Sequence, residues 1–271
     1  MSGAVNSPRS WQTLRERPTA SASMPVVEII TIAARPDLAP MISEFPQVWP
    51  SFMYHDATGS LYYDVAATEY PEFVMLAVDD GQPVARLFSV PFTWDGDPTK
   101  ALPEDGWDWA IRTAHQTRSD GSVPNLVSAL EITIRPDRRG RGLAAALLEA
   151  MRRNVSRLGF ADLVAPVRPN AKDDPTEPMT SYAFRTRADG LPVDPWLRVH
   201  VRAGGRIRNI APTSMTIPGT LAQWREWTGL AFDVSGPIHV PGALVPVMCA
   251  SEHDYGVYVE PNVWVHHRLA I

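Results

Sequence analysis

The chain has 271 residues, of which 45% are hydrophobic and 20% are charged, and it carries a net charge of −5 with a pI of about 5.8. This composition is that of an ordinary globular protein. It argues against a disordered chain and against non-specific binding to nucleic acid. The single cysteine, Cys249, excludes an internal disulfide and a cysteine metal cage. The sequence contains no run of about 20 apolar residues, the length that spans a membrane.

Proline and arginine are both over-represented. Proline accounts for 26 residues, about twice its ordinary usage of about 5%, which predicts ordered loops and interrupted elements. Only Lys100 and Lys172 are lysines, so 23 of the 25 basic residues are arginine. A codon bias explains such an excess; the alternative is that some guanidinium groups hold phosphates or carboxylates.

Residues 1–24 are polar and lack the apolar run of a secretory signal, so we expect a flexible N-terminal tail. Residues 25–271 are expected to form one domain with Pro-rich inserts. The first predicted elements are a strand over 26–34, a short helix from 35, and strands over 73–78 and 83–92 joined by a hairpin turn. A loop-rich stretch with at most one short helix over 107–116 follows, and then a strand over 126–134, a long helix over 140–158 and a strand over 161–167. After a Pro-rich insertion over 170–192, we expect a helix over 195–203, a strand over 206–217, a helix over 221–228 and a strand over 256–266. This order favours an α+β (mixed α/β) domain over a doubly wound fold.

The segment LEITIRPDRRGRGLAAA, residues 130–146, carries the clearest chemical signal. An apolar strand ends at Ile134, a polar turn follows, and Gly140 and Gly142 open a long amphipathic helix. Glycines let a backbone approach a ligand closely, and the first N–H groups of a helix are free. With the helix dipole they form an anion site suited to a phosphate or pyrophosphate.

A dinucleotide-binding interpretation fails on context. Gly140-x-Gly142-x-x-Ala145 matches that fingerprint formally, and Asp162 has nearly the spacing of its ribose-binding acid. However, Pro136 and charged residues separate the strand from the first glycine, and Asp162 starts the next strand instead of ending it. The sequence also contains no Walker A loop and no GxSxG nucleophile elbow.

Arg139-x-x-Gly142-x-Ala144 matches the R/Q-x-x-G-x-G/A signature of the GNAT (Gcn5-related N-acetyltransferase) superfamily, and IRPDRRGRGLAAALL resembles its motif A. The resemblance implies a central, mostly antiparallel sheet that is splayed at the acyl-CoA site and flanked by helices. It also implies acetyl-CoA or another acyl-CoA as co-substrate, with no metal. The residues it assigns to CoA binding are Ile132, Thr133, Ile134, Arg139, Gly140, Arg141, Gly142, Leu143, Ala144 and Asn170. Arg135 and Arg138 would add positive charge beside the pyrophosphate.

Acyl transfer from a thioester to an amine requires a base, because the protonated amine must lose a proton before attack. Glu131 is the first candidate: it lies on the strand face opposite Ile132 and Ile134 unless a bulge changes the parity, and Glu is common at this place in proteins that look like this. Glu260, in the last strand, is the second. For each, the alternative is an ordinary charged residue at a strand end, in a salt bridge for Glu131.

The acid that protonates the thiolate is harder to assign. The family's helix after the fifth strand usually carries a tyrosine near the sulfur, whereas here His200 takes that position if Gly204 takes the glycine position. A histidine could donate this proton, and the alternative is a partly buried structural histidine. Tyr182, in the insertion, is a weaker substitute.

The acceptor pocket is expected to form from the inserts at residues 52–63, 94–109 and 170–192. The second of these holds acids that could attract a cationic amine or simply face solvent, namely Asp95, Asp97, Glu104, Asp105 and Asp108. We expect a cytoplasmic, bacterial N-acetyltransferase for a small primary amine, with no nucleic-acid or membrane partner. A homodimer is one oligomeric state that the sequence leaves open. The alternatives are an acyltransferase for a longer acyl group or a non-amine acceptor, and a CoA-binding protein without catalysis.

Overall fold

The computed structural model describes residues 27–270, so the tail expected at residues 1–24 lies outside the described part of the chain. The strands are β1 (Glu28–Thr31), β2 (Val74–Asp79), β3 (Gln82–Phe92), β4 (Leu126–Ile134), β5 (Asp162–Val167), β6 (Arg206–Gly219), β7 (Gly236–Ile238), β8 (Val247–Ala250) and β9 (Tyr255–Arg268). The α-helices are α1 (Pro40–Ser43), α2 (Ala57–Tyr63), α3 (Ala66–Glu69), α4 (Gly106–Ser119), α5 (Leu143–Arg157), α6 (Met179–Tyr182), α7 (Pro195–Arg202) and α8 (Leu221–Thr228). The 3₁₀ turns are η1 (Pro36–Leu38), η2 (Ser51–His55), η3 (Pro136–Arg138) and η4 (Ser251–His253).

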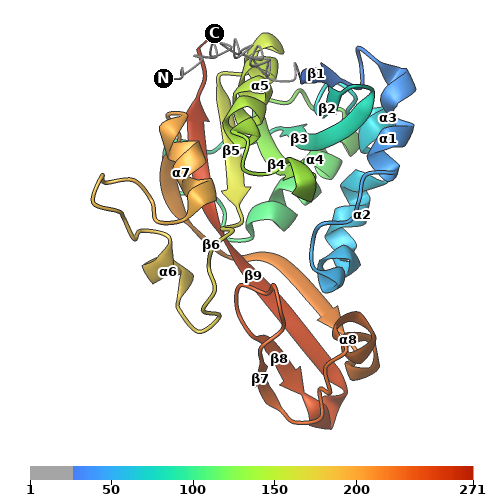
Figure 1. The fold of residues 1–271 in the computed structure, drawn as a ribbon, viewed down its shortest axis with the longest axis vertical. Helices are drawn as coiled ribbons and strands as arrows, with labels where there is room; N and C mark the ends of the chain where they lie inside the picture. The colour runs from blue at the N-terminus through green and yellow to red at the C-terminus, as the bar shows by residue number, and fades with distance from the viewer. Residues whose placement is uncertain (1–26, 271) are drawn as a thin grey trace, which may run out of the picture.

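All nine strands join one sheet, in the order β1-β2-β3-β4-β5-β9-β8-β7, with β6 paired to β9. The β4–β5 pair is parallel and the other pairs are antiparallel. Helices flank the upper part of this sheet on both sides (Figure 1). The architecture confirms the expected mixed α/β fold class with a mostly antiparallel sheet.

Each face of the upper sheet has its own apolar core. On one face, α5 and α7 contribute Leu147, Met151 and Leu197 to a core that also takes in β4 and β5 residues such as Val127 and Leu163. On the other face, α2 and α4 pack against β2 and β3 through a second core, which is rich in aromatic side chains. Apolar residues of α5 recur at helical spacing, which is why the sequence predicted this helix well.

Strands β6 and β9 continue beyond the upper sheet and carry a smaller lobe, seen at the bottom of Figure 1. There β7, β8 and α8 pack around a third core that includes Trp224, Tyr258 and Phe52. The sequence predicted α8 at its observed bounds but gave no strand for β7 or β8. Both are short, with three residues in β7 and four in β8, and β7 begins with Gly and Pro, so period-two patterning is weak there.

Three other expectations differ from the structure. The short helix expected over 107–116 is present, and it is longer than expected: α4 has 14 residues. Two helices, α2 and α3, occupy a region where none was predicted. The helix expected from Gly140 begins at Leu143, because Gly140 and Gly142 both have φ of +76°, which a right-handed helix cannot contain. Among residues 27–270, every helix is too short or too polar to cross a lipid bilayer.

Candidate active site

The sheet opens between its two central parallel strands. Strands β4 and β5 pair only at Val127 with Leu163 and at Ser128 with Val164, and beyond these positions the two strands separate. The register between β3 and β4 shifts at the same level, which leaves Leu130 as an extra residue in β4. The opening exposes backbone edges of both strands. An extended ligand arm can pair with such an edge as an added strand would.

The glycine loop lies at the end of β4, where η3 leads into α5. Gly140 and Gly142 hold the left-handed conformation, and a Cβ at either position would meet nothing within 4 Å. Arg139, Gly140, Arg141 and Gly142 are exposed, and Leu143 and Ala144 form the first turn of α5. The free N–H groups of this turn face the loop. This arrangement can hold an anionic group such as a pyrophosphate.

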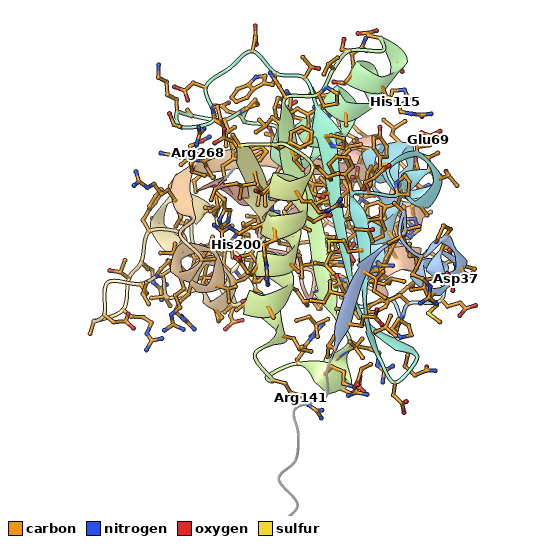
Figure 2. All side chains as sticks on the ribbon, turned by 90° about the horizontal axis from the view of Figure 1, so that it is seen from above. Asp37, Glu69, His115, Arg141, His200 and Arg268 are labelled. Carbon is orange, nitrogen blue, oxygen red and sulfur yellow. The ribbon has the colours of Figure 1, made fainter. Side chains whose placement is uncertain are left out.

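The four arginines expected beside this loop differ in their partners. Arg135 makes two hydrogen bonds of 2.7 Å to the carboxylate of Asp137, and Arg138 donates to Asp79 at 2.7 Å. Arg139 donates from Nε to the Ile134 carbonyl at 3.3 Å. Arg141 projects away from the body of the molecule (Figure 2).

The two faces of β4 have different surroundings, as the alternation predicted. Ile132 and Ile134 pack against the core under α5, whereas Glu131 and Thr133 are buried on the opposite side. Glu131 accepts hydrogen bonds from Arg86 Nε at 2.7 Å and from the Tyr63 hydroxyl at 3.1 Å. The bulge at Leu130 precedes these residues, so it leaves their alternation intact.

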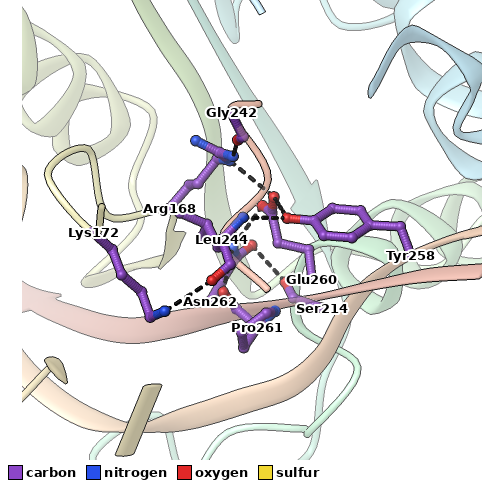
Figure 3. A network of polar contacts seen from close by, with 9 residues as sticks. All are labelled: Arg168, Lys172, Ser214, Gly242, Leu244, Tyr258, Glu260, Pro261 and Asn262. Atoms are coloured by element: carbon purple, nitrogen blue, oxygen red, sulfur yellow. Dashed lines mark hydrogen bonds and ion pairs between the residues drawn. The ribbon is translucent and has the colours of Figure 1, made fainter. Parts of the chain in front are cut away.

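Glu260 lies at the waist between the upper sheet and the lower lobe, at the centre of a buried polar network (Figure 3). It accepts hydrogen bonds from Arg168 Nε at 2.9 Å, Tyr258 at 2.7 Å and Asn262 at 3.0 Å. Asn262 in turn accepts from Ser214 at 2.7 Å. Glu260 is fully buried, with three donors around it.

His200 belongs to α7 and lies beside α5, where it is buried (Figure 2). Its Nδ1 lies 2.9 Å from Nε2 of His267, which pairs with Leu163 where β4 and β5 are still joined. Burial, and then the neighbouring His267, hold the pKa of His200 well below its usual range. A neutral ring enclosed at the closed end of the sheet does not suit contact with a leaving thiolate. The structure therefore does not bring His200 together with Glu131.

Tyr182 and Asn170 meet at the start of α7. Asp194, the N-cap of α7, accepts hydrogen bonds from the Tyr182 hydroxyl at 3.0 Å and from the backbone N–H of Asn170 at 2.9 Å. Burial and the Asp194 carboxylate raise the pKa of Tyr182, so its hydroxyl keeps its proton at neutral pH. Both residues follow β5 on the side where the sheet opens.

A cavity of about 450 Å³ adjoins the end of β5. Its walls are the segments at residues 168–175 and 239–244, and they include the cationic side chains of Arg168 and Lys172. Lys172 donates to the Leu244 carbonyl at 2.8 Å, which ties the two walls together. The volume is within the range of small-ligand sites.

Of the five acids expected to attract a cationic amine, only Asp108 is buried. Asp95, Asp97 and Glu104 are exposed and Asp105 is half-buried, as the solvated-loop alternative described them.

The segment at residues 52–63 was expected to line the acceptor pocket, but the sequence did not single out Asp56 or Tyr63 within it, and it gave no indication of Arg86 or Arg168. Asp56 could have been recognised as an N-cap, since a short polar side chain precedes the helix that begins at Ala57. The other three come from distant segments, and only the fold places them here. No group of His, Cys, Asp or Glu side chains that could hold a metal ion occurs within the described residues.

Comparison with known proteins gives one clear relative. The chain is 33% identical over 279 residues to an arginine N-acetyltransferase, avaD, from Aspergillus versicolor, an alignment that covers 90% of this chain and 95% of that protein. No protein-family model matches the chain.

Among solved structures, the fold resembles the loading GNATL domain of CurA from Lyngbya majuscula, with a TM-score of 0.53 and 15% identity over 89% of this chain and 97% of that one. A GNAT-like decarboxylase, GphF, solved with isobutyryl-CoA, has a TM-score of 0.48 and 16% identity over 90% of this chain and all of that one. The full-length relative, the splayed sheet and the glycine loop agree: this chain belongs to the GNAT superfamily of acyl-CoA-dependent N-acetyltransferases.

Proposed function

We propose that this enzyme transfers the acetyl group of acetyl-CoA to an amine of arginine or of a closely related basic amino-acid derivative. The arginine N-acetyltransferase that is 33% identical over most of both chains supports this acceptor class. The buried acids on the α2 and α4 side of the opening also support it, because a cationic substrate is attracted to such a region. The observation that carries the proposal is the opening between β4 and β5, with the glycine loop at one end and buried carboxylates beside it.

Different residues around the opening bind different parts of acetyl-CoA. The N–H groups at the start of α5, with Arg139 and Arg141, bind the pyrophosphate of acetyl-CoA, and the edge formed by Ile132, Thr133 and Ile134 pairs with its pantetheine arm. Asn170 contacts the same arm from the end of β5.

The reaction is a direct attack. The deprotonated amine forms a C–N bond to the thioester carbonyl, a backbone N–H of β4 stabilises the oxyanion, and the C–S bond then breaks. Glu131 takes the proton that the amine loses, and the departing thiolate takes a proton to become the thiol of CoA. Tyr182 is the proposed donor of that proton, and it must exchange its hydrogen bond to Asp194 for one to the thiolate.

The test is a thiol-release assay with acetyl-CoA over a panel of L-arginine, agmatine, L-ornithine, L-lysine and neutral amino acids. Thiol release with the basic amines, and acetylated product by mass spectrometry, are expected. Release with none of them would contradict the proposal. Turnover only with longer acyl-CoA or with alcohols would favour the alternative acyltransferase, and tight CoA binding without turnover would favour an inactive CoA-binding protein.

The cytoplasmic location, the bacterial source and the homodimer expected from the sequence stay predictions. Light scattering coupled to size-exclusion chromatography tests the homodimer directly.

A further inference from the structure

The cavity of about 450 Å³ lies at the waist of the molecule, between the end of β5 and the lower lobe, and we call it the waist cavity. One wall is the segment at residues 168–175, which follows β5, and the other is the segment at residues 239–244, which connects β7 to β8. Pro169, Pro175 and Pro241 lie in these walls. Because a proline ring fixes φ, the backbone around the cavity is restricted before any ligand binds.

The waist cavity adjoins the opening of the sheet. Strands β4 and β5 last pair at Ser128 with Val164, so the cavity lies at the end of β5 that has separated from β4. Asn170 lines the cavity, and its backbone N–H and the Tyr182 hydroxyl both donate to Oδ2 of Asp194. A ligand in the cavity therefore lies next to residues with proposed roles toward the pantetheine arm and the leaving thiolate.

Lys172 brings a buried positive charge to the waist cavity. Its side chain is 6% exposed, and Nζ donates to the Leu244 carbonyl at 2.8 Å and to the Asp174 carbonyl (Figure 3). An ammonium group has three N–H donors, so two carbonyl acceptors leave one donor for a ligand. The other basic group of this wall, Arg168, is already neutralised by Glu260 at 2.9 Å. The uncompensated charge of the cavity is therefore that of Lys172.

The acids that follow Lys172 in the chain do not compensate this charge at close range. The Asp174 carboxylate accepts from the turn after it at 2.8 Å, Glu177 is paired with an arginine of the insertion at 3.0 Å, and Asp173 is exposed. Among the described residues, the partners of Nζ are backbone carbonyls alone. Burial accordingly lowers the pKa of Lys172, because water and close anions both fail to stabilise the ammonium form.

We propose that the waist cavity binds the carboxylate of an amino-acid acceptor, with Lys172 as its counter-ion, while an amine of the same molecule reaches the opening. The proposal rests on the proposed function and narrows its substrate class to amines that carry a carboxylate. A carboxylate accepts a charge-assisted hydrogen bond from the remaining N–H of Lys172. One uncompensated positive charge matches one carboxylate, whereas a phosphate monoester would bring close to two negative charges.

The decisive experiment compares L-arginine with two molecules that lack its carboxylate. Agmatine has a hydrogen in place of that group, and L-argininamide has a neutral amide of nearly the same shape. Calorimetric titrations into the CoA-loaded enzyme at pH 7 should show L-arginine binding about 10- to 100-fold more tightly than either, the range for a hydrogen bond between charged groups in a buried site.

Substitution of Lys172 tests the residue itself. Lys172→Gln should weaken L-arginine binding until it equals that of agmatine and L-argininamide, and should leave those two almost unchanged. Lys172→Arg keeps the charge and should keep most of the preference. Lys100→Gln makes the same change at the other lysine of the chain, which is exposed and paired with Asp97, and should alter no affinity.

A purely structural role for Lys172, as a clamp between the two walls, would give a different pattern. Lys172→Gln would then weaken all three ligands equally, and that result would overturn the proposal. A rise in the Kd of acetyl-CoA with no change for L-arginine would also overturn it, because the cavity would then belong to the coenzyme. Thermal melts establish that each variant folds. If Lys172→Gln does not fold, the wild-type comparison and Lys172→Arg still decide.

The two proposals can fail separately. Equal affinities of wild type for L-arginine, agmatine and L-argininamide, together with thiol release, would overturn the carboxylate site and leave the acetyltransferase proposal standing. Absence of thiol release with every amine would overturn the proposed function, and a preference for L-arginine that disappears in Lys172→Gln would still support the carboxylate site. Absence of binding by all three ligands would overturn both.

Discussion

The two sides of the β4–β5 opening use different parts of the polypeptide. Toward α5 the surface consists of backbone: two left-handed glycines, the first turn of a helix and a free strand edge. Toward α2 and α4 it consists of buried ionised and aromatic side chains from at least four segments. A backbone site recognises what every acyl-CoA shares, whereas a side-chain site can change with the acceptor. The comparison predicts that mutations on the α5 side impair the binding of acyl-CoA, whereas mutations on the α2 and α4 side change the binding of the acceptor.

The largest effect is expected from Glu260→Ala, which removes the acceptor for Arg168, Tyr258 and Asn262 and leaves a buried guanidinium without its partner. Breaking a buried ion pair in this way costs about 3–5 kcal/mol of unfolding free energy. Urea denaturation measures it. Asp37→Ala, which breaks an exposed pair with Arg35, is the control and should cost less than about 1 kcal/mol. Similar losses of unfolding free energy in both variants would contradict the stabilising role of the buried network.

The next effect is a pH dependence of stability from the two buried histidines. Burial lowers the pKa of His267 to about 3 and also lowers that of His200. Their folded-state pKa values lie below the unfolded ones, so the unfolded chain binds more protons below about pH 6.5, and stability falls with decreasing pH. Each histidine contributes a slope of about 1.4 kcal/mol per pH unit once the unfolded ring is protonated.

Denaturation at a series of pH values between 7 and 5 tests this slope. His267→Asn should flatten this slope, and His253→Asn, at an exposed ring in η4, should leave it unchanged.

If His200→Ala lowers turnover while the acyl-CoA affinity stays constant, the general-acid role expected from the sequence would gain support over a structural one.

On the backbone side, Gly142→Ala should raise the KM for acetyl-CoA while leaving acceptor selectivity intact. The φ of +76° costs an alanine about 1–2 kcal/mol, and relaxing that strain moves the N–H groups that face the pyrophosphate. This corresponds to a loss of about 5- to 30-fold. Gly121→Ala, with φ of +65° and an equally open environment, bears the same strain away from the loop. An equal rise in KM for both would contradict the loop's role.

The smallest effect separates the loop arginines. Arg141→Gln should raise the KM for acetyl-CoA about two- to fivefold at low ionic strength, because an exposed charge near the pyrophosphate acts through a screened field. Arg135→Gln should change it less, since Asp137 already neutralises that guanidinium. Steady-state kinetics at two salt concentrations distinguish the variants, and a larger effect for Arg135 would reverse this ranking.

The backbone side could be predicted from the sequence because its determinants are consecutive. Arg139 to Ala144 stand together, and the strand before them and the helix after them have clear periods. On the acceptor side the sequence predicted the inserts at residues 52–63 and 94–109 and named Asp108 among their acids. It could not single out Asp56 or Arg86, because these residues are far apart in the chain and only the fold shows which side chains are buried and paired. The expectation for His200 shows the same limit. Its position along the helix suggested a general acid, but the sequence pattern could not predict its contact with His267 of β9.

Strand β9 links all of these parts. Its second half fills the place between β5 and β6 in the upper sheet, and its first half pairs with β8 in the lower lobe. The ribosome makes β9 after every other strand described here, so neither lobe can complete its sheet until β9 has emerged. Such non-local pairing slows folding and exposes strand edges for longer. The nascent chain must therefore hold a half-finished sheet, with the edge of β5 open, from the synthesis of β5 until β9 has emerged.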